Sequence, residues 1–320
     1  MAINTKYILA ILLIGAFLIS GCVAPPQPDK KVNYGFPLGS EAIDLSFLEN
    51  QPPASVVSGE QFQIAVDVKN VGAKDTIVDI ILDGLGGTYT VSPGFVKSTE
   101  TLAGRTLIVD PSVASKSTEI PGGEEAVIFD VTPKLIVGVN VQESPIVAHA
   151  IFPFESRAIT RICAKSRQSL SIGAAGICEI MGKRDVGTSA GPIKVTSIEQ
   201  TVNTLIIHIE NVGKGNPFVN VGENELKYSG VLPKDINLFT EQDNIDLTKV
   251  EIGTISDLID CKIPEGGAKK IKLIDNKGLI TCTTKFTEVS SESLETMVLT
   301  FNYGYQQKIN TNIRVVAIPV

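Results

Sequence analysis

The sequence predicts an all-β protein made of two tandem antiparallel β-sandwich domains. Apolar and polar residues alternate along most of the chain, as they do in strands that bury one face. The alternating runs are short, and Gly, Pro, Asn and Asp, which favour turns, separate them. Three short landmarks also recur in the same order about 140–150 residues apart, which indicates a duplicated domain.

The first predicted element is a lipoprotein signal peptide over residues 1–21. Lys6 gives it a positive start, and residues 8–19 carry no charge. This run of about 12 residues is shorter than the roughly 20 that a membrane-spanning helix needs. It ends in Ile19-Ser20-Gly21-Cys22, which resembles the lipobox of prokaryotic lipoproteins. The resemblance implies cleavage before Cys22 and attachment of lipid to its sulfur.

Two alternatives to a lipobox remain at this point: an ordinary signal peptide, or an uncleaved anchor, with Cys22 present by chance. Residues 22–40 are expected to form a tether, because their Pro-rich, polar start favours an extended and solvated chain. A lipid on Cys22 would hold the protein at the extracytoplasmic face of the cell membrane. The tether would then keep the first domain away from the bilayer.

The cysteine count favours an oxidising compartment. The chain has five cysteines, so four remain if Cys22 carries lipid. Three pairings are possible, and the local pairs Cys163–Cys178 and Cys261–Cys282 are favoured because each lies within one predicted unit. Reduced, buried thiols are the alternative. Zinc ligation does not fit, because there is no C-x-x-C spacing and both histidines lie far from the cysteines.

The first sandwich is predicted over residues 41–163 and the second over residues 193–320. Apolar alternation is clearest in four runs, at residues 61–69, 127–131, 205–209 and 297–305. Residues 164–192 are rich in Gly, Ala and Ser and are expected to form a linker, pinned by the Cys163–Cys178 disulfide. A small-residue contact surface for a partner, at residues 172–177, is the alternative interpretation of this segment.

The repeated landmarks have physical roles. Each Asn-x-Gly follows an alternating strand and tolerates the left-handed backbone that a turn needs. Aromatic residues two apart project from one face of a late strand and can fill the space between sheets. The paired segments are residues 68–72 and 209–213, residues 121–124 and 264–267, and residues 151–154 and 301–305.

A strand that ends in Asn-x-Gly, with Pro53 and Gly59-Glu60 ahead of it, resembles CARDB and related immunoglobulin-like domains of archaeal and bacterial surface proteins. The resemblance covers residues 40–160 well and residues 190–320 less well, because the second unit lacks the Gly-Glu lead-in. It implies immunoglobulin-like sandwiches and a link to adhesion and envelope architecture. It carries no shared catalytic residues.

Charge and motifs argue against several functions. The net charge is −7, and no basic patch stands out, so nucleic acid is not an expected partner. Ser189 lies in a G-x-S-x-G match, but a nucleophile elbow needs a strand before the serine and a helix after it. A flexible linker accounts better for this segment. His149 and His208 have no neighbours at metal-ligand spacing.

An oxygen-rich cluster runs from Glu241 through Asp243 to Asp246, but EF-hand spacing is absent, so a solvated acidic loop is favoured over a weak calcium site. Residues 83–87 are expected to form a turn rather than a dinucleotide loop. No cofactor, metal or small-molecule substrate is therefore expected.

The resulting hypothesis is a non-catalytic, lipid-anchored surface protein that presents sandwich domains for binding, adhesion or envelope structure. A protein partner in the cell envelope is expected. One alternative is an accessory subunit of an envelope transporter, pilus or surface-layer complex. A minor alternative is a serine hydrolase that uses Ser189.

Overall fold

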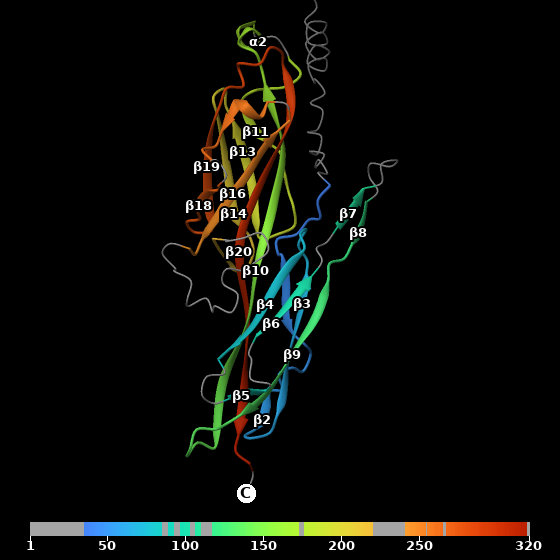
Figure 1. Ribbon diagram of the computed structural model, residues 1–320, viewed down its shortest axis with the longest axis vertical. Coiled ribbons are helices and arrows are strands. Elements are labelled where there is room, and N and C mark those ends of the chain that lie inside the picture. The colour runs from blue at the N-terminus through green and yellow to red at the C-terminus, as the bar shows by residue number, and fades with distance from the viewer. Residues whose placement is uncertain are drawn as a thin grey trace, which may run out of the picture. The chain divides into compact units, whose positions relative to one another are not determined.

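The computed structural model describes residues 35–84, 89–92, 97–102, 106–109, 117–172, 176–219, 241–253, 255–264 and 267–318. Its contacts divide the chain into two units, Met1–Val32 and Asn33–Val320. The described residues all belong to the second unit, and they are nearly all strand (Figure 1). The all-β, antiparallel, sandwich-like fold predicted from the alternating pattern is therefore confirmed.

One face of the first half is a four-stranded antiparallel sheet in the order β1-β3-β9-β5. Its strands are β1 (Ile43–Phe47), β3 (Phe62–Asn70), β9 (Glu124–Pro133) and β5 (Tyr89–Ser92). In β3 the residues Ile64, Val66 and Val68 are fully buried, as their alternation predicts. A separate two-stranded ribbon joins β7 (Thr106–Val109) to β8 (Ser117–Ile120).

The second half has a five-stranded sheet in the order β11-β13-β14-β19-β17. Its strands are β11 (Gly182–Arg184), β13 (Ile193–Gln200), β14 (Thr204–Asn211), β19 (Lys277–Thr284) and β17 (Ile259–Asp260). Leu205, Ile207 and Ile209 of β14 are buried, and the residues between them are partly exposed. The sheet therefore covers the core with one face and meets solvent with the other.

A nine-stranded sheet runs through both halves, with the main order β18-β16-β20-β10-β4-β6. These strands are β18 (Lys269–Lys272), β16 (Asn244–Ile252), β20 (Ser293–Val316), β10 (Val141–Ala164), β4 (Thr76–Asp83) and β6 (Lys97–Leu102). Three short strands pair beside this path: β12 (Val186–Thr188) with β10, and β15 (Asn216–Phe218) and β2 (Ser55–Val57) with β20.

Strands β10 and β20 pair antiparallel over 24 residues each, from Val141↔Val316 to Ala164↔Ser293. The first part of β10 pairs with β4 of the first half, whereas its last part pairs with β12. Strand β20 does the opposite, since it pairs first with β16 and ends beside β2. The last strand of each half therefore continues into the other half.

This exchange differs from the simple series of two sandwiches joined by a linker. The segment 164–192 contains α2 (Arg167–Ile172), β11 and β12, and its residues Ile180 and Ala190 are buried. A single hydrophobic core runs through both halves. The contacts therefore show no boundary between residues 33 and 320.

Four aromatic rings fill the core where β10 and β20 cross from one half to the other. Phe152 pairs with Tyr305 and Phe154 with Tyr303, and neighbouring ring centroids lie 5.7–6.2 Å apart. All four side chains are buried. Tyr303 shares a 2.6 Å hydrogen bond with Ser156, so its phenolic group is satisfied in the core.

The first Asn-x-Gly segment packs against this aromatic cluster. The Asn70 side-chain oxygen accepts the Gly72 N–H (2.9 Å), and its amide donates to the carbonyls of Lys74 (2.9 Å) and Leu102 (3.2 Å). A Cβ on Gly72 would lie 2.5 Å from the Phe154 ring. Glycine is required here because the turn and the ring approach each other so closely.

The second Asn-x-Gly segment repeats the arrangement on the other strand. The Asn211 oxygen accepts the Gly213 N–H (3.3 Å) and the Tyr305 hydroxyl (3.1 Å), and its amide donates to the Gly215 carbonyl (2.9 Å). A Cβ on Gly213 would lie 2.4 Å from the Tyr305 hydroxyl. The two sequence repeats thus place equivalent turns on equivalent aromatic residues of β10 and β20.

Pro153 and Gly304 face each other at the centre of the long strand pair. The Pro153 carbonyl accepts the Thr76 hydroxyl (2.6 Å), so the missing N–H of this proline also points away from β20. A Cβ on Gly304 would lie 2.1 Å from the Phe218 ring of β15. Proline and glycine are uncommon in central strands, but the backbone direction at Pro153 and the close ring at Gly304 allow both here.

We expect the two halves to be unable to fold separately. A fragment of residues 35–164 lacks the end of β20, so the apolar inner face and the open edge of its β10 stay uncovered. Expressed alone, this fragment should be insoluble or should associate with itself. Co-expressed with residues 165–320, it should form a soluble complex that size-exclusion chromatography detects. A monomeric fragment with a cooperative unfolding transition would contradict the exchange.

Candidate functional site

Cys22, the predicted lipidation site, lies outside the described residues, so its lipid attachment stays a prediction. The four other cysteines form two disulfides in the predicted local pairs, Cys163–Cys178 and Cys261–Cys282. Disulfides persist in oxidising compartments, and they indicate an extracytoplasmic environment for this chain.

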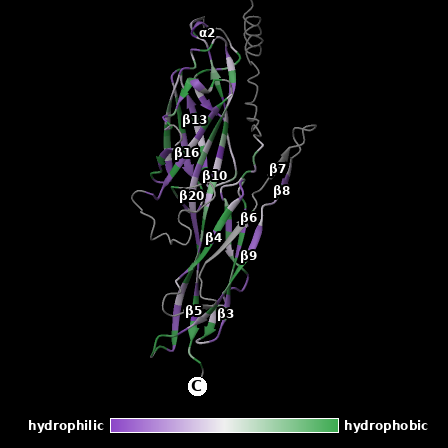
Figure 2. Cartoon of the chain, in the orientation of Figure 1, coloured by the Kyte–Doolittle hydropathy of each residue, from purple (hydrophilic) through white to green (hydrophobic). Residues whose placement is uncertain are grey.

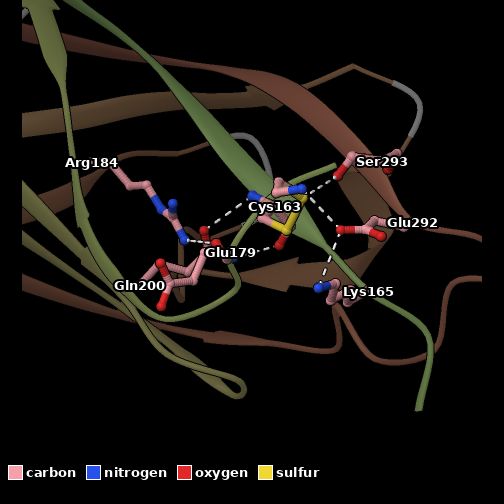
Figure 3. Close-up of a disulfide and its surroundings, with 8 residues drawn as sticks. Cys163, Lys165, Glu179, Arg184, Gln200, Glu292 and Ser293 are labelled. Carbon is pink, nitrogen blue, oxygen red and sulfur yellow. Dashed lines mark hydrogen bonds and ion pairs between the residues drawn. A yellow bond between two sulfur atoms is a disulfide. The ribbon is translucent and has the colours of Figure 1, made fainter. Parts of the chain in front are cut away.

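The Cys163–Cys178 disulfide joins the end of β10 to the segment that leads into β11 (Figure 3). The Gln200 side chain holds both backbone groups of Cys163, because it accepts its N–H (3.0 Å) and donates to its carbonyl (2.5 Å). Cys163 is fully buried. This disulfide therefore links the last residues of β10 to the second half of the chain.

Glu292 anchors the other end of this disulfide. Its carboxylate accepts the Cys178 N–H (3.0 Å) and lies 3.3 Å from the Lys165 ammonium group (Figure 3). The Cys178 N–H and Lys165 together hold the pKa of Glu292 below its ordinary value. Glu292, the residue just before β20, thus binds directly to the disulfide loop that follows β10.

The second disulfide joins Cys261, just after β17, to the buried Cys282 of β19. Lys269 donates to the Cys261 carbonyl (2.8 Å) and so connects this edge to β18. Within the described ranges, the one group of three His, Cys or acidic residues with clustered ligand atoms is Cys163, Cys178 and Glu292. Its two sulfurs are bonded to each other, so this group serves as a structural crosslink.

Ser189 lies between two strands, β12 and β13, rather than on a strand-to-helix elbow. Its side chain is buried, and its hydroxyl oxygen accepts the Arg157 N–H (2.9 Å). Its own N–H donates to the Arg157 carbonyl (2.9 Å). Ser189 therefore extends the pairing of β12 with β10. The Gly- and Ser-rich composition of this segment did not predict that role.

Lys194 lies beside Ser189, and its ammonium group donates to the Ser189 carbonyl (2.7 Å). Burial lowers the pKa of Lys194 to about 8. Its single described hydrogen bond goes to a backbone carbonyl, not to the serine hydroxyl. The pair therefore does not have the arrangement in which a neutral lysine activates a serine.

The two histidines lie on different strands and have separate partners. His149 of β10 lies 3.0 Å from the Gln306 amide and 3.9 Å from the Asp83 carboxylate, and burial lowers its pKa. His208 of β14 lies 3.7 Å from the Glu199 carboxylate on the solvent face of the five-stranded sheet. His149 thus has a cross-strand hydrogen bond, whereas the buried Nε2 of His208 forms none within the described residues.

The acidic segment around Asp243 is a turn into β16. Asp243 has a positive φ of 56°, and its N–H donates to the Pro217 carbonyl (2.8 Å). Asp246 already belongs to β16, where it pairs with Asn302. Burial raises the pKa of Asp246, which disfavours its charged form. The segment therefore serves as a strand entry, and its carboxylates do not meet in one cluster.

The site that sequence reasoning missed is a shallow depression of about 400 Å³ on the outward face of β10, β20 and β16. Polar and charged side chains surround it: Glu155, Arg157, Thr248, Lys249, Glu251, Thr300 and Asn302, together with Val298. Two ion pairs lie along it, Glu155–Arg157 at 2.7 Å and Lys249–Glu251 at 2.6 Å. We call this site the polar depression.

A β-bulge shapes the floor of the polar depression. The register between β16 and β20 shifts between Leu247 and Lys249, and the Thr248 hydroxyl donates to the Thr300 carbonyl (3.2 Å). The side-chain oxygen of Asn302 is buried and accepts no hydrogen bond within the described part of the chain. The depression thus presents partly exposed charges of both signs, which suit a polar group of a partner.

Comparisons with known proteins give no family. No protein-family model matches the chain, and no curated protein matches it. Among solved structures, AvmM, which catalyses macrocyclization in alchivemycin A biosynthesis, is 18% identical over 34% of this chain and 73% of its own, with a TM-score of 0.17. Spo0M, a sporulation control protein from Bacillus subtilis, is 11% identical over 64% of this chain and 89% of its own, with a TM-score of 0.16. Such low TM-scores support no assignment.

Within the described ranges, the structure has no helix of the length and apolar character needed to cross a membrane.

Removing either disulfide should destabilise the fold without preventing it from forming. The loops that they close have sequence separations of 15 and 21 residues. In the chain-entropy model, a loop of this size gives about 3 kcal/mol. We expect Cys163→Ala with Cys178→Ala, and separately Cys261→Ala with Cys282→Ala, each to lower the free energy of unfolding by about that amount in urea titrations. Detection of free thiols at these positions in the denatured, unreduced protein would contradict both bridges.

The half-buried Lys194 should make stability depend on alkaline pH. Its folded-state pKa of about 8 lies below the ordinary value of 10.5. Between these values the unfolded chain binds more protons than the folded one, so stability rises with pH in this window. Lys194→Met should remove that rise in urea titrations at pH 7–10.5, whereas the control Lys277→Met, at an exposed position of β19, should keep it. If the stability of Lys194→Met changed with pH as in the wild type, the rise in stability would not come from Lys194.

Proposed function

We propose that this chain is a non-catalytic, lipid-anchored protein of the extracytoplasmic membrane face, which presents its β-sandwich unit to a protein partner in the envelope. The observation that carries the proposal is the apolar run of residues 8–19 that closes on Ile19-Ser20-Gly21-Cys22. A cysteine there is the acceptor expected for a lipid, and the polar, Pro-rich residues after it suit a tether.

The two disulfides support the same compartment from independent residues. Cys163–Cys178 and Cys261–Cys282 both lie in the second half, and both tie down strands that border the core. A reducing cytosol would leave such thiols free. An exported chain therefore agrees with the crosslinks as well as with the N-terminal segment.

A binding role is supported by how the polar residues are used. Ser189 and His149, two side chains that catalysis would readily recruit, form hydrogen bonds to the backbone or across strands. The polar depression, by contrast, is open, and the side chains of its two ion pairs are partly exposed to solvent. A partner that places polar or charged groups against the two ion pairs would complete this surface.

The lipid anchor can be tested at Cys22. We expect the mature wild-type protein to begin at Cys22 and to carry a lipid, which mass spectrometry of its N-terminal peptide would show. Cys22→Ala should lack the lipid and keep the uncleaved signal, because the thiol that accepts the lipid is gone. Val23→Ala should behave like the wild type. A wild-type N-terminus elsewhere, or an unmodified Cys22, would contradict the proposal.

A further inference from the structure

An apolar turn joins β9 to β10 at the end of the long strand pair. The Val139 N–H donates to the Ile136 carbonyl (3.0 Å), and Gly138 has a φ of +86°, so Val137 occupies the tip. The Val137 side chain is fully exposed and Ile136 is 57% exposed. Aliphatic residues are unusual at such positions, where Gly, Asn, Asp and Ser dominate.

Neighbouring aliphatic residues enlarge this surface. Val141, the first residue of β10, is 44% exposed, and Ile318 is 64% exposed. The Ala317 N–H donates to the Asn140 carbonyl (2.8 Å), which holds the C-terminal segment beside the turn. Figure 2 shows hydrophobic residues at this end of β10. We call Ile136, Val137, Val139, Val141 and Ile318 together the apolar tip.

The apolar tip is held in place rather than loosely attached. Leu135 packs against the hydrophobic core, and its N–H donates to the Ser58 hydroxyl (3.1 Å). No charged residue occurs between Leu135 and Val141. The fold therefore fixes a convex, uncharged, aliphatic projection in solvent, which matches the acyl region of a bilayer better than a polar protein surface.

The tether determines which membrane the tip can reach. The described chain begins beside the aromatic cluster, where the Gly39 carbonyl accepts the Gly191 N–H (3.3 Å) and a Cβ on Gly191 would touch Phe154. From Pro153 to Val141, β10 spans about 40 Å at roughly 3.3 Å per residue. Residues 23–34, which precede the described chain, reach roughly 40 Å when extended. The tether is therefore long enough for Cys22 and the tip to meet one bilayer.

We propose that the apolar tip inserts into the outer leaflet of the bilayer that holds the Cys22 lipid. The inference rests on the proposed lipid anchor for the identity of that membrane. A second apolar contact strengthens attachment by a single lipid anchor and limits how the anchored unit tilts. The polar depression, on β16 and the crossing part of β10, would then be held at a fixed height above the lipid headgroups.

The test uses a chain that starts at Val23 and carries an N-terminal histidine tag, because every described sheet and both disulfides lie within it. The tag attaches the chain to phosphatidylcholine vesicles that contain nickel-chelating lipid, so attachment does not depend on Cys22. Val137→Cys carries an environment-sensitive fluorophore. The control is Leu279→Cys, with the same fluorophore at an exposed aliphatic site on β19.

We expect vesicles with spin-labelled acyl chains to quench the Val137 fluorophore at least severalfold more than the Leu279 fluorophore. The change Ile136→Asp in the Val137→Cys protein should abolish this difference, because a carboxylate opposes insertion. Equal quenching at both positions would overturn the proposal. Protection of the Val137 fluorophore without vesicles, together with a doubled molar mass in solution, would overturn it in favour of tip-to-tip association of two copies.

The outcomes of the two membrane experiments are independent. Failure of the lipid anchor appears as an unmodified Cys22 in the cellular protein and leaves the vesicle measurement unaffected. If the apolar tip does not insert, the fluorophore at position 137 stays in water on vesicles and is not quenched, whatever the state of Cys22.

Discussion

The antiparallel pairing of β10 with β20 is the constraint on which the remaining structure depends. Its 24 residue pairs give each half a strand that starts in the other half. The aromatic cluster lies at the crossing, and the two Asn-x-Gly turns close on it from the two repeats. The Cys163–Cys178 disulfide and Glu292 then fasten the second end of the pair. The aromatic cluster, the two Asn-x-Gly turns and the Cys163–Cys178 disulfide thus all contact this one pair of strands.

The sequence predicts well those features that depend on near neighbours. Alternation with a period of two marks β3 and β14, because one face of each strand meets the core whichever strands lie beside it. The Asn-x-Gly turns follow from backbone preference, and the local disulfides follow from short spacing. The aromatic pairs at residues 152–154 and 303–305 were likewise expected to lie between sheets, and they do so.

The exchange itself depends on contacts between distant residues, and composition carries no sign of it. The pattern of β10 is the same whether its last residues cover one half or the other, so it cannot reveal the partner strand. The Gly and Ser content of residues 164–192 resembled a linker, although β12 and Ser189 there pair with β10. The polar depression required a bulge at Thr248, which no periodicity predicts.

The exchanged strand also sets the order in which this protein can fold. Val141 pairs with Val316, about 175 residues later, and the closure of such long loops makes β-rich chains slow to fold. During synthesis the first half waits for the last strand to emerge, and its apolar face stays open to aggregation for that time. A chain that crosses the membrane before it folds avoids this delay, because its C-terminal strand arrives before compaction begins. The topology thus favours folding that begins only after the whole chain, with its last strand, is available.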